Sequence, residues 1–248
     1  MSFNLIEIFQ KMGPFALAVV AVLVLMAMGS MAVFVERVFV FWRSRRMSRR
    51  FAGKASALLG KHAHDGFVTE AKAHSASHLA ALLASGMRTY LAAVKEPGEL
   101  GPVELTRREL TRRAEAVSAD LRRGMSLLAS VGSVAPFVGL LGTVVGIIAA
   151  FEGIAREGSG GLGAVSAGIS EALIVTALGL VVAIPSVLAF NFLSARADNL
   201  LLALEQSRGE FVDYLENQHG RKDIGGRKVR AADDVHAHPV EGRASATA

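Results

Sequence analysis

Three long stretches without charged residues constrain this chain more than any other feature of its sequence. The first run, residues 15–35, contains no charged side chain. A helix rises about 1.5 Å per residue, so this run would span about 31 Å, the thickness of a bilayer's hydrocarbon core. The second run covers 125–151, and the third covers 162–193, where Glu171 is the one charge. Three such runs predict an all-α integral membrane protein with three transmembrane helices.

The first run is expected to be a retained span and not a cleaved signal peptide. A signal peptide has an apolar core of only about 7–15 residues, with basic residues before it. Here Glu7 and Lys11 cancel in charge before the run, whereas five arginines and one lysine follow it within residues 43–54.

The basic residues near the ends of the spans are distributed unequally. One side receives residues 43–54, three arginine pairs between 107 and 123, and the segment after Arg196, whereas the other receives only Lys11 and Arg156. Lys and Arg concentrate on the cytoplasmic side of membrane proteins. We therefore expect a multi-pass protein of the bacterial inner membrane, with a periplasmic N-terminus and a cytoplasmic C-terminus. The net charge of +5 then reflects topology, and no nucleic-acid partner is expected.

The segments between and after the spans have two different compositions. In the long loop, apolar residues recur at spacings of three and four from Leu79 to Val94, which predicts a helix. The second and third spans are expected to continue as helices into the cytoplasm, whereas the polar end of the chain has no period and is expected to be disordered. The predicted segments are a periplasmic N-terminus (1–14), the first span (15–42), a cytoplasmic helical loop (43–124), the second span (125–155), a periplasmic loop (156–163), the third span (164–193), a cytoplasmic helix (194–218) and a disordered cytoplasmic tail (219–248).

Small residues form stripes along the second and third spans. In lipid, such stripes let helix backbones approach closely, so they predict tight helix neighbours, either within one chain or between copies. Three spans can hardly surround a polar pathway alone, which favours an oligomer. The residues expected to serve packing in these spans are Gly132, Gly139, Gly142, Gly146, Gly168, Gly179 and Pro185.

Glu171 is the one formal charge inside a span. An acidic residue at a span centre costs about 2.5–3.5 kcal/mol on insertion scales, and less nearer the surface. Two interpretations are open. Glu171 either lines a wet interior or ion path, or it snorkels or pairs with a backbone donor.

Thr143 and Thr176 are expected at similar depths in an antiparallel hairpin, near the membrane midplane. A buried threonine usually bonds the carbonyl of its own helix, so each alone is unremarkable. A ring of such pairs would instead supply uncharged hydrogen-bonding groups at the driest point of a pore.

Neither a metal site nor an enzyme site is predicted. His74 and His78 have a ligand-like i,i+4 spacing, but no acidic or cysteine partner accompanies them at a telling distance, so they and His62 and His64 are expected on the solvated surface. The chain has no cysteine, no His-Glu-x-x-His and no Gly-x-Ser-x-Gly. No cofactor is expected.

Two motifs on the second and third spans carry a family resemblance. Residues 133–146 read SVAPFVGLLGTVVG, and residues 168–185 read GISEALIVTALGLVVAIP. Together they resemble the MotA/TolQ/ExbB proton channel family. The chain is similar to the ExbB/TolQ branch, because MotA-type subunits have four spans.

The resemblance implies a homopentamer whose second and third spans line a central pore, with the first spans outside. It implies two copies of an ExbD/TolR-like single-span partner in the pore, which supply the titrating aspartate. Thr143 and Thr176 would line the pore, and Glu171 would be the polar residue on the outer side. Proton-motive force would then drive mechanical work on the cell envelope, in TonB-dependent import or a Tol-Pal type system, through a TonB- or TolA-like protein. Membrane lipids would surround the ring.

Alternative functions remain open from the sequence. A gliding-motility motor subunit of the same family is one. A non-conducting membrane scaffold or a small-solute transporter is another, although no internal repeat of the kind that transporters usually carry is evident.

Overall fold

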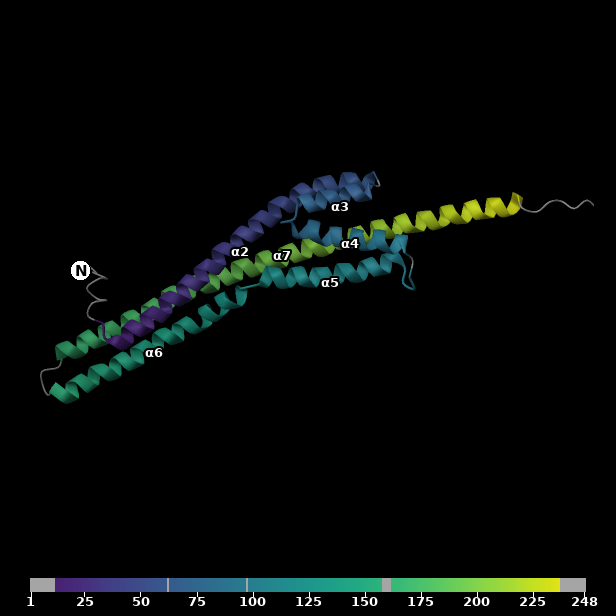
Figure 1. Ribbon diagram of the computed structural model, residues 1–248. Coiled ribbons are helices and arrows are strands. Elements are labelled where there is room, and N and C mark those ends of the chain that lie inside the picture. Colours follow the sequence, from purple (N-terminus) through teal and green to yellow (C-terminus); the bar gives the residue numbers. More distant parts are fainter. Residues whose placement is uncertain (1–11, 62, 97, 158–161, 237–248) are drawn as a thin grey trace, which may run out of the picture. The chain divides into compact units, whose positions relative to one another are not determined.

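The computed structural model describes residues 12–61, 63–96, 98–157 and 162–236, and this part of the chain is helical without a strand (Figure 1). This confirms the predicted all-α class. Residues 1–11, His62, Pro97, residues 158–161 of the predicted periplasmic loop and the last twelve residues lie outside the description. The helices are α2 (Pro14–Gly60), α3 (His64–Ala73), α4 (His78–Lys95), α5 (Pro102–Arg122), α6 (Met125–Glu157) and α7 (Leu162–His236).

Three helical stretches in the described residues are long and apolar enough to cross a membrane, as the sequence predicted. They are Pro14–Gly60, Pro102–Gly153 and Val165–Gly220. The second stretch is interrupted at Gly124, which takes a φ of 74° between α5 and α6. Only glycine adopts this left-handed conformation at little cost, so the expected continuous helix is divided there.

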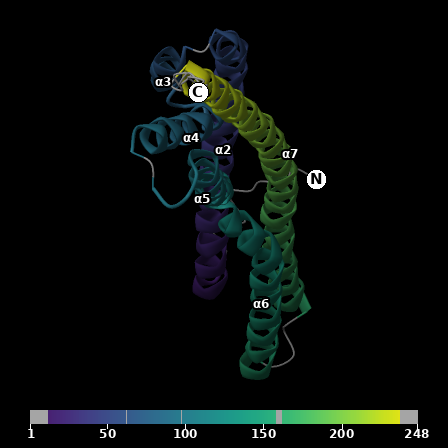
Figure 2. The same ribbon diagram turned by 90° about the vertical axis from the view of Figure 1, so that its right-hand side faces the viewer.

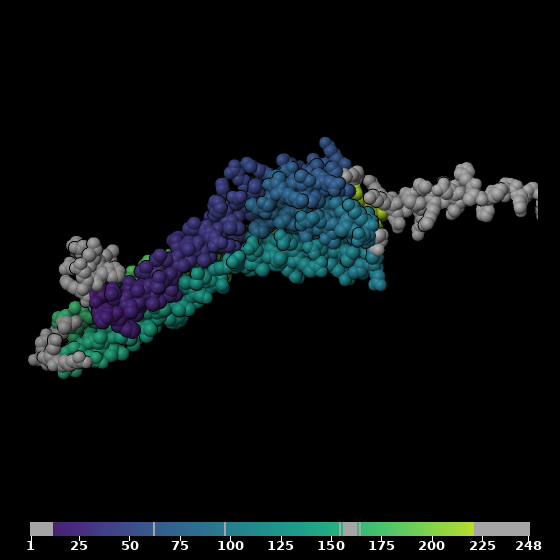
Figure 3. All heavy atoms as spheres, viewed as in Figure 1, coloured from purple at the N-terminus to yellow at the C-terminus, as the bar shows by residue number. Residues whose placement is uncertain are grey.

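The described chain divides into two compact units. Unit 1 consists of Met1–Met47 and Ala116–Leu201, and unit 2 consists of Ser48–Glu115 and Leu202–Ala248. In unit 1, side chains from three helices share one apolar core, which includes Leu23 of α2, Ala135 of α6 and Val175 of α7. The atoms of α2 lie against those of α6 in the space-filling view (Figure 3).

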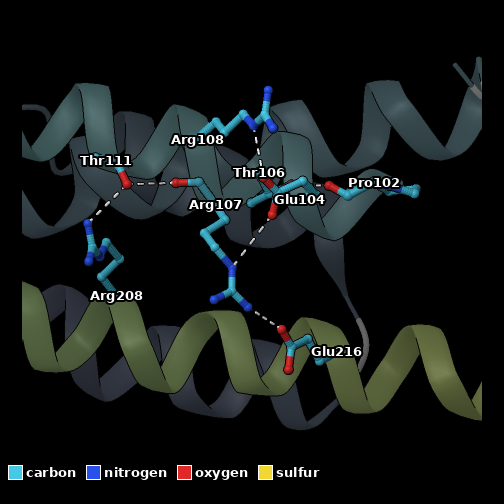
Figure 4. A network of polar contacts seen from close by, with 8 residues as sticks. All are labelled: Pro102, Glu104, Thr106, Arg107, Arg108, Thr111, Arg208 and Glu216. Carbon is cyan, nitrogen blue, oxygen red and sulfur yellow. Dashed lines mark hydrogen bonds and ion pairs between the residues drawn. The ribbon is translucent and has the colours of Figure 1, made fainter. Parts of the chain in front are cut away.

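Unit 2 is a helical assembly with an aromatic core. Phe67 packs between Phe51 and Phe211, with ring centroids 5.5 and 5.9 Å apart. Polar contacts join α5 to α7 at its surface, where Arg107 pairs with Glu216 and Arg208 donates to the Thr111 hydroxyl at 3.2 Å (Figure 4).

Helix α7 is longer than the sequence indicated. It continues to His236, whereas the chain was expected to lose regular structure from residue 219. Adding residues to an existing helix avoids the cost of nucleation, so a polar segment without an apolar face can still continue it.

Candidate functional site between α6 and α7

Helices α6 and α7 run antiparallel and side by side (Figure 2), and their register is defined by contacts at small residues. Glycine has no side chain, so the separation of the two helices at each glycine can be described by the atoms that an added Cβ would meet. Such an atom would meet the opposite helix in the pairs Gly132–Val187, Gly139–Gly179, Gly146–Ala172 and Gly168–Ala150.

The closest approach of the two backbones is at Gly139 and Gly179. A Cβ atom at Gly179 would lie 2.8 Å from the carbonyl oxygen of Ala135 and 3.1 Å from the Cα of Gly139. The six glycines singled out in the sequence all face the neighbouring helix of the same chain. Within the single chain, these glycines therefore lie at the contact between α6 and α7. Pro185, by contrast, is exposed on α7.

Thr143 and Thr176 lie at the same level of the hairpin. Gly142 next to Thr143 packs on Val175 next to Thr176. Thr143 is 7% exposed, and its hydroxyl donates to the carbonyl of Leu140 at 2.7 Å. The Thr176 hydroxyl crosses to α6 and donates to the carbonyl of Gly139 at 2.9 Å.

Each of these hydroxyls donates its one hydrogen bond to a backbone carbonyl. A threonine oxygen that donates in this way still carries two lone pairs. It can therefore accept a hydrogen bond from a protonated group that approaches it, although it cannot itself release a proton at ordinary pH.

Glu171 lies five residues before Thr176 and reaches the start of α2. Its Oε1 accepts a hydrogen bond from the backbone N–H of Gly13 at 2.8 Å. The carbonyl of Gly13 accepts the first bond of α2 from Leu17, so this N–H lies at the positive end of the helix dipole. The carboxylate thus has a backbone donor in the single chain, as one of its two interpretations required.

Two polar contacts in unit 1 were not anticipated from the sequence. The buried Ser186 of α7 donates to the Ser30 hydroxyl of α2 at 3.2 Å. Arg37 of α2 is 5% exposed and donates from Nη1 to the carbonyl of Asp120 at 2.9 Å, just before the break at Gly124. Charged residues directly after an uncharged run, such as Glu36 and Arg37, typically lie at a membrane surface. The sequence therefore contains no signal that the Arg37 side chain is buried against α5.

The histidine prediction is wrong for His74. This residue is 8% exposed, and its Nδ1 lies 3.0 Å from the carbonyl oxygen of Glu70 and 3.3 Å from the Glu70 carboxylate. Its burial follows from α3, which places Glu70 one turn earlier, and from α2, which brings the Phe51 ring to 6.1 Å from the His74 ring. The hydrogen bond from Lys54 lowers the pKa of Glu70. Among the described residues, no group of three or more potential ligands could hold a metal ion.

Large apolar side chains are exposed on the outer faces of α6 and α7. Phe137 is 69% exposed, Val181 65% and Leu188 63%. Soluble monomers rarely expose apolar surfaces of this extent to water, so lipid or other protein chains are expected to cover them.

Residues 74–206, which are more than half of the chain, match the sequence model of the MotA/TolQ/ExbB proton channel family. The chain belongs to this family. The match contains all of α6 and the part of α7 that carries Thr176 and Glu171.

Relatives within the MotA/TolQ/ExbB family agree with the ExbB/TolQ branch. The biopolymer transport protein ExbB of Neisseria meningitidis serogroup A is 34% identical over 226 residues, covering 87% of this chain and 98% of the relative. ExbB of Xanthomonas campestris pv. campestris is 44% identical over 112 residues, 45% of this chain and 44% of the relative. The Tol-Pal system protein TolQ of Pseudomonas aeruginosa is 40% identical over 134 residues, 54% of this chain and 52% of the relative. The chain thus matches about half of the length of these last two relatives.

Proposed function

We propose that this chain is the pore-forming subunit of a proton-driven motor in the bacterial inner membrane. With an ExbD/TolR-like partner, it converts proton-motive force into mechanical work on the cell envelope, in TonB-dependent import or a Tol-Pal type system. The observation that carries the proposal is the α6–α7 hairpin of this family, which holds Thr143 and Thr176 at one level.

The active form in this proposal is a homopentamer around two copies of the partner. The exposed apolar faces of α6 and α7 support association with further helices. The chain has no aspartate in residues 15–42, 125–155 or 164–193, so the group that takes up and releases the proton comes from the partner. The N-terminus and the loop after α6 face the periplasm, and the C-terminus faces the cytoplasm.

The two threonines act as acceptors for this carrier. When the partner's carboxyl is protonated, its O–H can donate to Thr143 Oγ1 or Thr176 Oγ1, which retain their lone pairs. When the partner's carboxyl is ionised, the apolar midplane of the membrane raises the free energy of its charged form. Glu171 supplies a negative charge on the periplasmic side, where it favours entry of cations into the pore.

The assembly is tested by native mass spectrometry of the tagged chain, gently extracted from its own bacterium. Five copies with two of a small single-span protein are expected, and the periplasmic domain of that protein would identify the pathway. A monomer or dimer without such a partner would contradict the motor and favour a scaffold.

The site is tested by proton uptake into vesicles that contain the whole complex. Replacing both threonines by the isosteric valine, Thr143→Val with Thr176→Val, removes two hydrogen-bond acceptors and is expected to lower partner-dependent uptake roughly ten-fold or more. The matched control, Thr143→Ser with Thr176→Ser, keeps the hydroxyls and should retain most of the uptake. Equal uptake by the two variants, with assembly intact, would exclude the threonines from the pathway.

A further inference from the structure

The outer face of α2 carries an exposed apolar stripe that none of the described residues covers. Leu25 is 67% exposed, Met28 64%, Val35 58% and Phe39 56%, and Trp42 at 60% continues the same face. These residues are three, four or seven apart, as one helix face requires. From Phe15 to Trp42 the helix covers about 40 Å, which corresponds to a bilayer including its headgroup layers.

This stripe ends in a cluster of arginines at Trp42. Arg43, Arg45 and Arg46 are all exposed, and the guanidinium carbon of Arg46 lies 5.5 Å from the centre of the Trp42 ring. None of the three arginines forms an ion pair with a described residue. The nearest acidic side chain on α2, Glu36, is already paired with Arg37.

Two other arginines of unit 1, Arg37 and Arg122, differ from the cluster because they have polar protein partners. Arg37 is buried and donates to a backbone carbonyl of α5, and Arg122 pairs with Asp198 of α7 at 2.7 Å. Arg196 of α7 repeats the exposed arrangement, because its guanidinium carbon lies 5.4 Å from the centre of the Phe192 ring.

We propose that Trp42, Arg43, Arg45 and Arg46 form a docking site for anionic phospholipids of the cytoplasmic leaflet. A guanidinium group binds the phosphate of a headgroup through paired hydrogen bonds, and an indole ring prefers the interface at that depth. The apolar stripe above the cluster accommodates the acyl chains of the same lipid. The site rests on the membrane location in the proposed function, and it selects lipid by charge complementarity.

Trp42 allows a direct test because it is the only tryptophan of the chain. The full chain, with any partner that co-purifies, is reconstituted in two kinds of phosphatidylcholine vesicle. One contains brominated phosphatidylglycerol, and the other contains the same fraction of brominated phosphatidylcholine. Bromine quenches the fluorescence of a nearby indole. We expect brominated phosphatidylglycerol to quench Trp42 several-fold more effectively, with a preference that weakens as the salt concentration rises.

Two variants of the cluster separate charge from folding. Changing all three arginines to glutamine, Arg43→Gln with Arg45→Gln and Arg46→Gln, is expected to remove most of this several-fold preference, so that the two lipids quench almost equally, whereas the same three changes to lysine retain much of it. A matched control removes three charges from unit 2, Lys61→Gln with Arg88→Gln and Lys95→Gln, and should leave the preference unchanged.

The outcomes distinguish the site from the membrane location. Equal quenching by the two lipids would overturn the docking site and leave the membrane location intact. Absence of quenching by either lipid would also overturn the docking site, because Trp42 would then face protein or water and not lipid.

Discussion

Glu109 shows how single residues stabilise unit 2. The Ser85 hydroxyl of α4 donates to Glu109 Oε1 at 2.6 Å, and Arg112 donates to Oε2 at 2.8 Å. Both bonds favour the ionised carboxylate, first the one from Ser85, and they lower the pKa of Glu109 below 4.5. A carboxyl whose pKa is lower in the folded state stabilises that state above its unfolded pKa.

Removing the Ser85 hydroxyl should therefore have a pH-dependent effect. In Ser85→Ala, the pKa of Glu109 rises toward its ordinary value, and the variant is expected to be less stable by about 1 kcal/mol at pH 7. The difference should disappear as the pH falls through the folded pKa of Glu109, because the carboxyl is then protonated in both proteins. The measurement is the midpoint of thermal unfolding in detergent at pH 7 and pH 3, with exposed Ser75→Ala as the control. An equal loss at both pH values would mean that Ser85 acts through packing alone.

The pairing of α6 with α7 depends on an element-scale property, the absence of side chains where the helices touch. At Gly179 the nearest atoms, the Ala135 carbonyl oxygen and the Gly139 Cα, belong to the backbone of α6. A backbone cannot rotate away as a side chain can, so an added methyl group must separate the two helices.

Gly179→Ala is expected to destabilise the hairpin by about 1–3 kcal/mol through overpacking, although alanine is the better helix former. Gly209→Ala on the same helix is the matched control, because its added Cβ would meet no atom within 4 Å apart from the neighbouring backbone of its own helix. That change should stabilise the chain by up to about 1 kcal/mol. Thermal unfolding of the two variants in one detergent measures both effects. Similar stabilisation by both would contradict the close contact at Gly179.

At the scale of the whole molecule, the proposed topology follows from the distribution of arginines and lysines about the three spans. The structure contributes the three long apolar helices, and the absence of cysteine from the chain makes the topology simple to test.

Single cysteines introduced into the two loops should show, by their accessibility to a thiol reagent, that these loops lie on opposite sides of the membrane. In intact spheroplasts, an impermeant thiol reagent is expected to label Ser159→Cys, in the loop between the second and third spans, and to label Gly98→Cys only after lysis. The parent chain without cysteine controls for background. Labelling of Gly98→Cys in intact cells would reverse the proposed orientation.

Much of this protein was determined by its sequence alone. The three spans, the helical class and the family could be predicted, because hydropathy, charge and local motifs are properties of consecutive residues. The glycine stripes likewise predicted close helix contacts.

The tertiary structure decided which groups meet. The partner of Thr176 is a carbonyl on another helix, Glu171 meets the N–H of Gly13, and Arg37 turns inward to α5. His74 became buried for the same reason. Each of these environments depends on residues distant along the chain, and helical periodicity defines a face of a helix without naming the element that covers it.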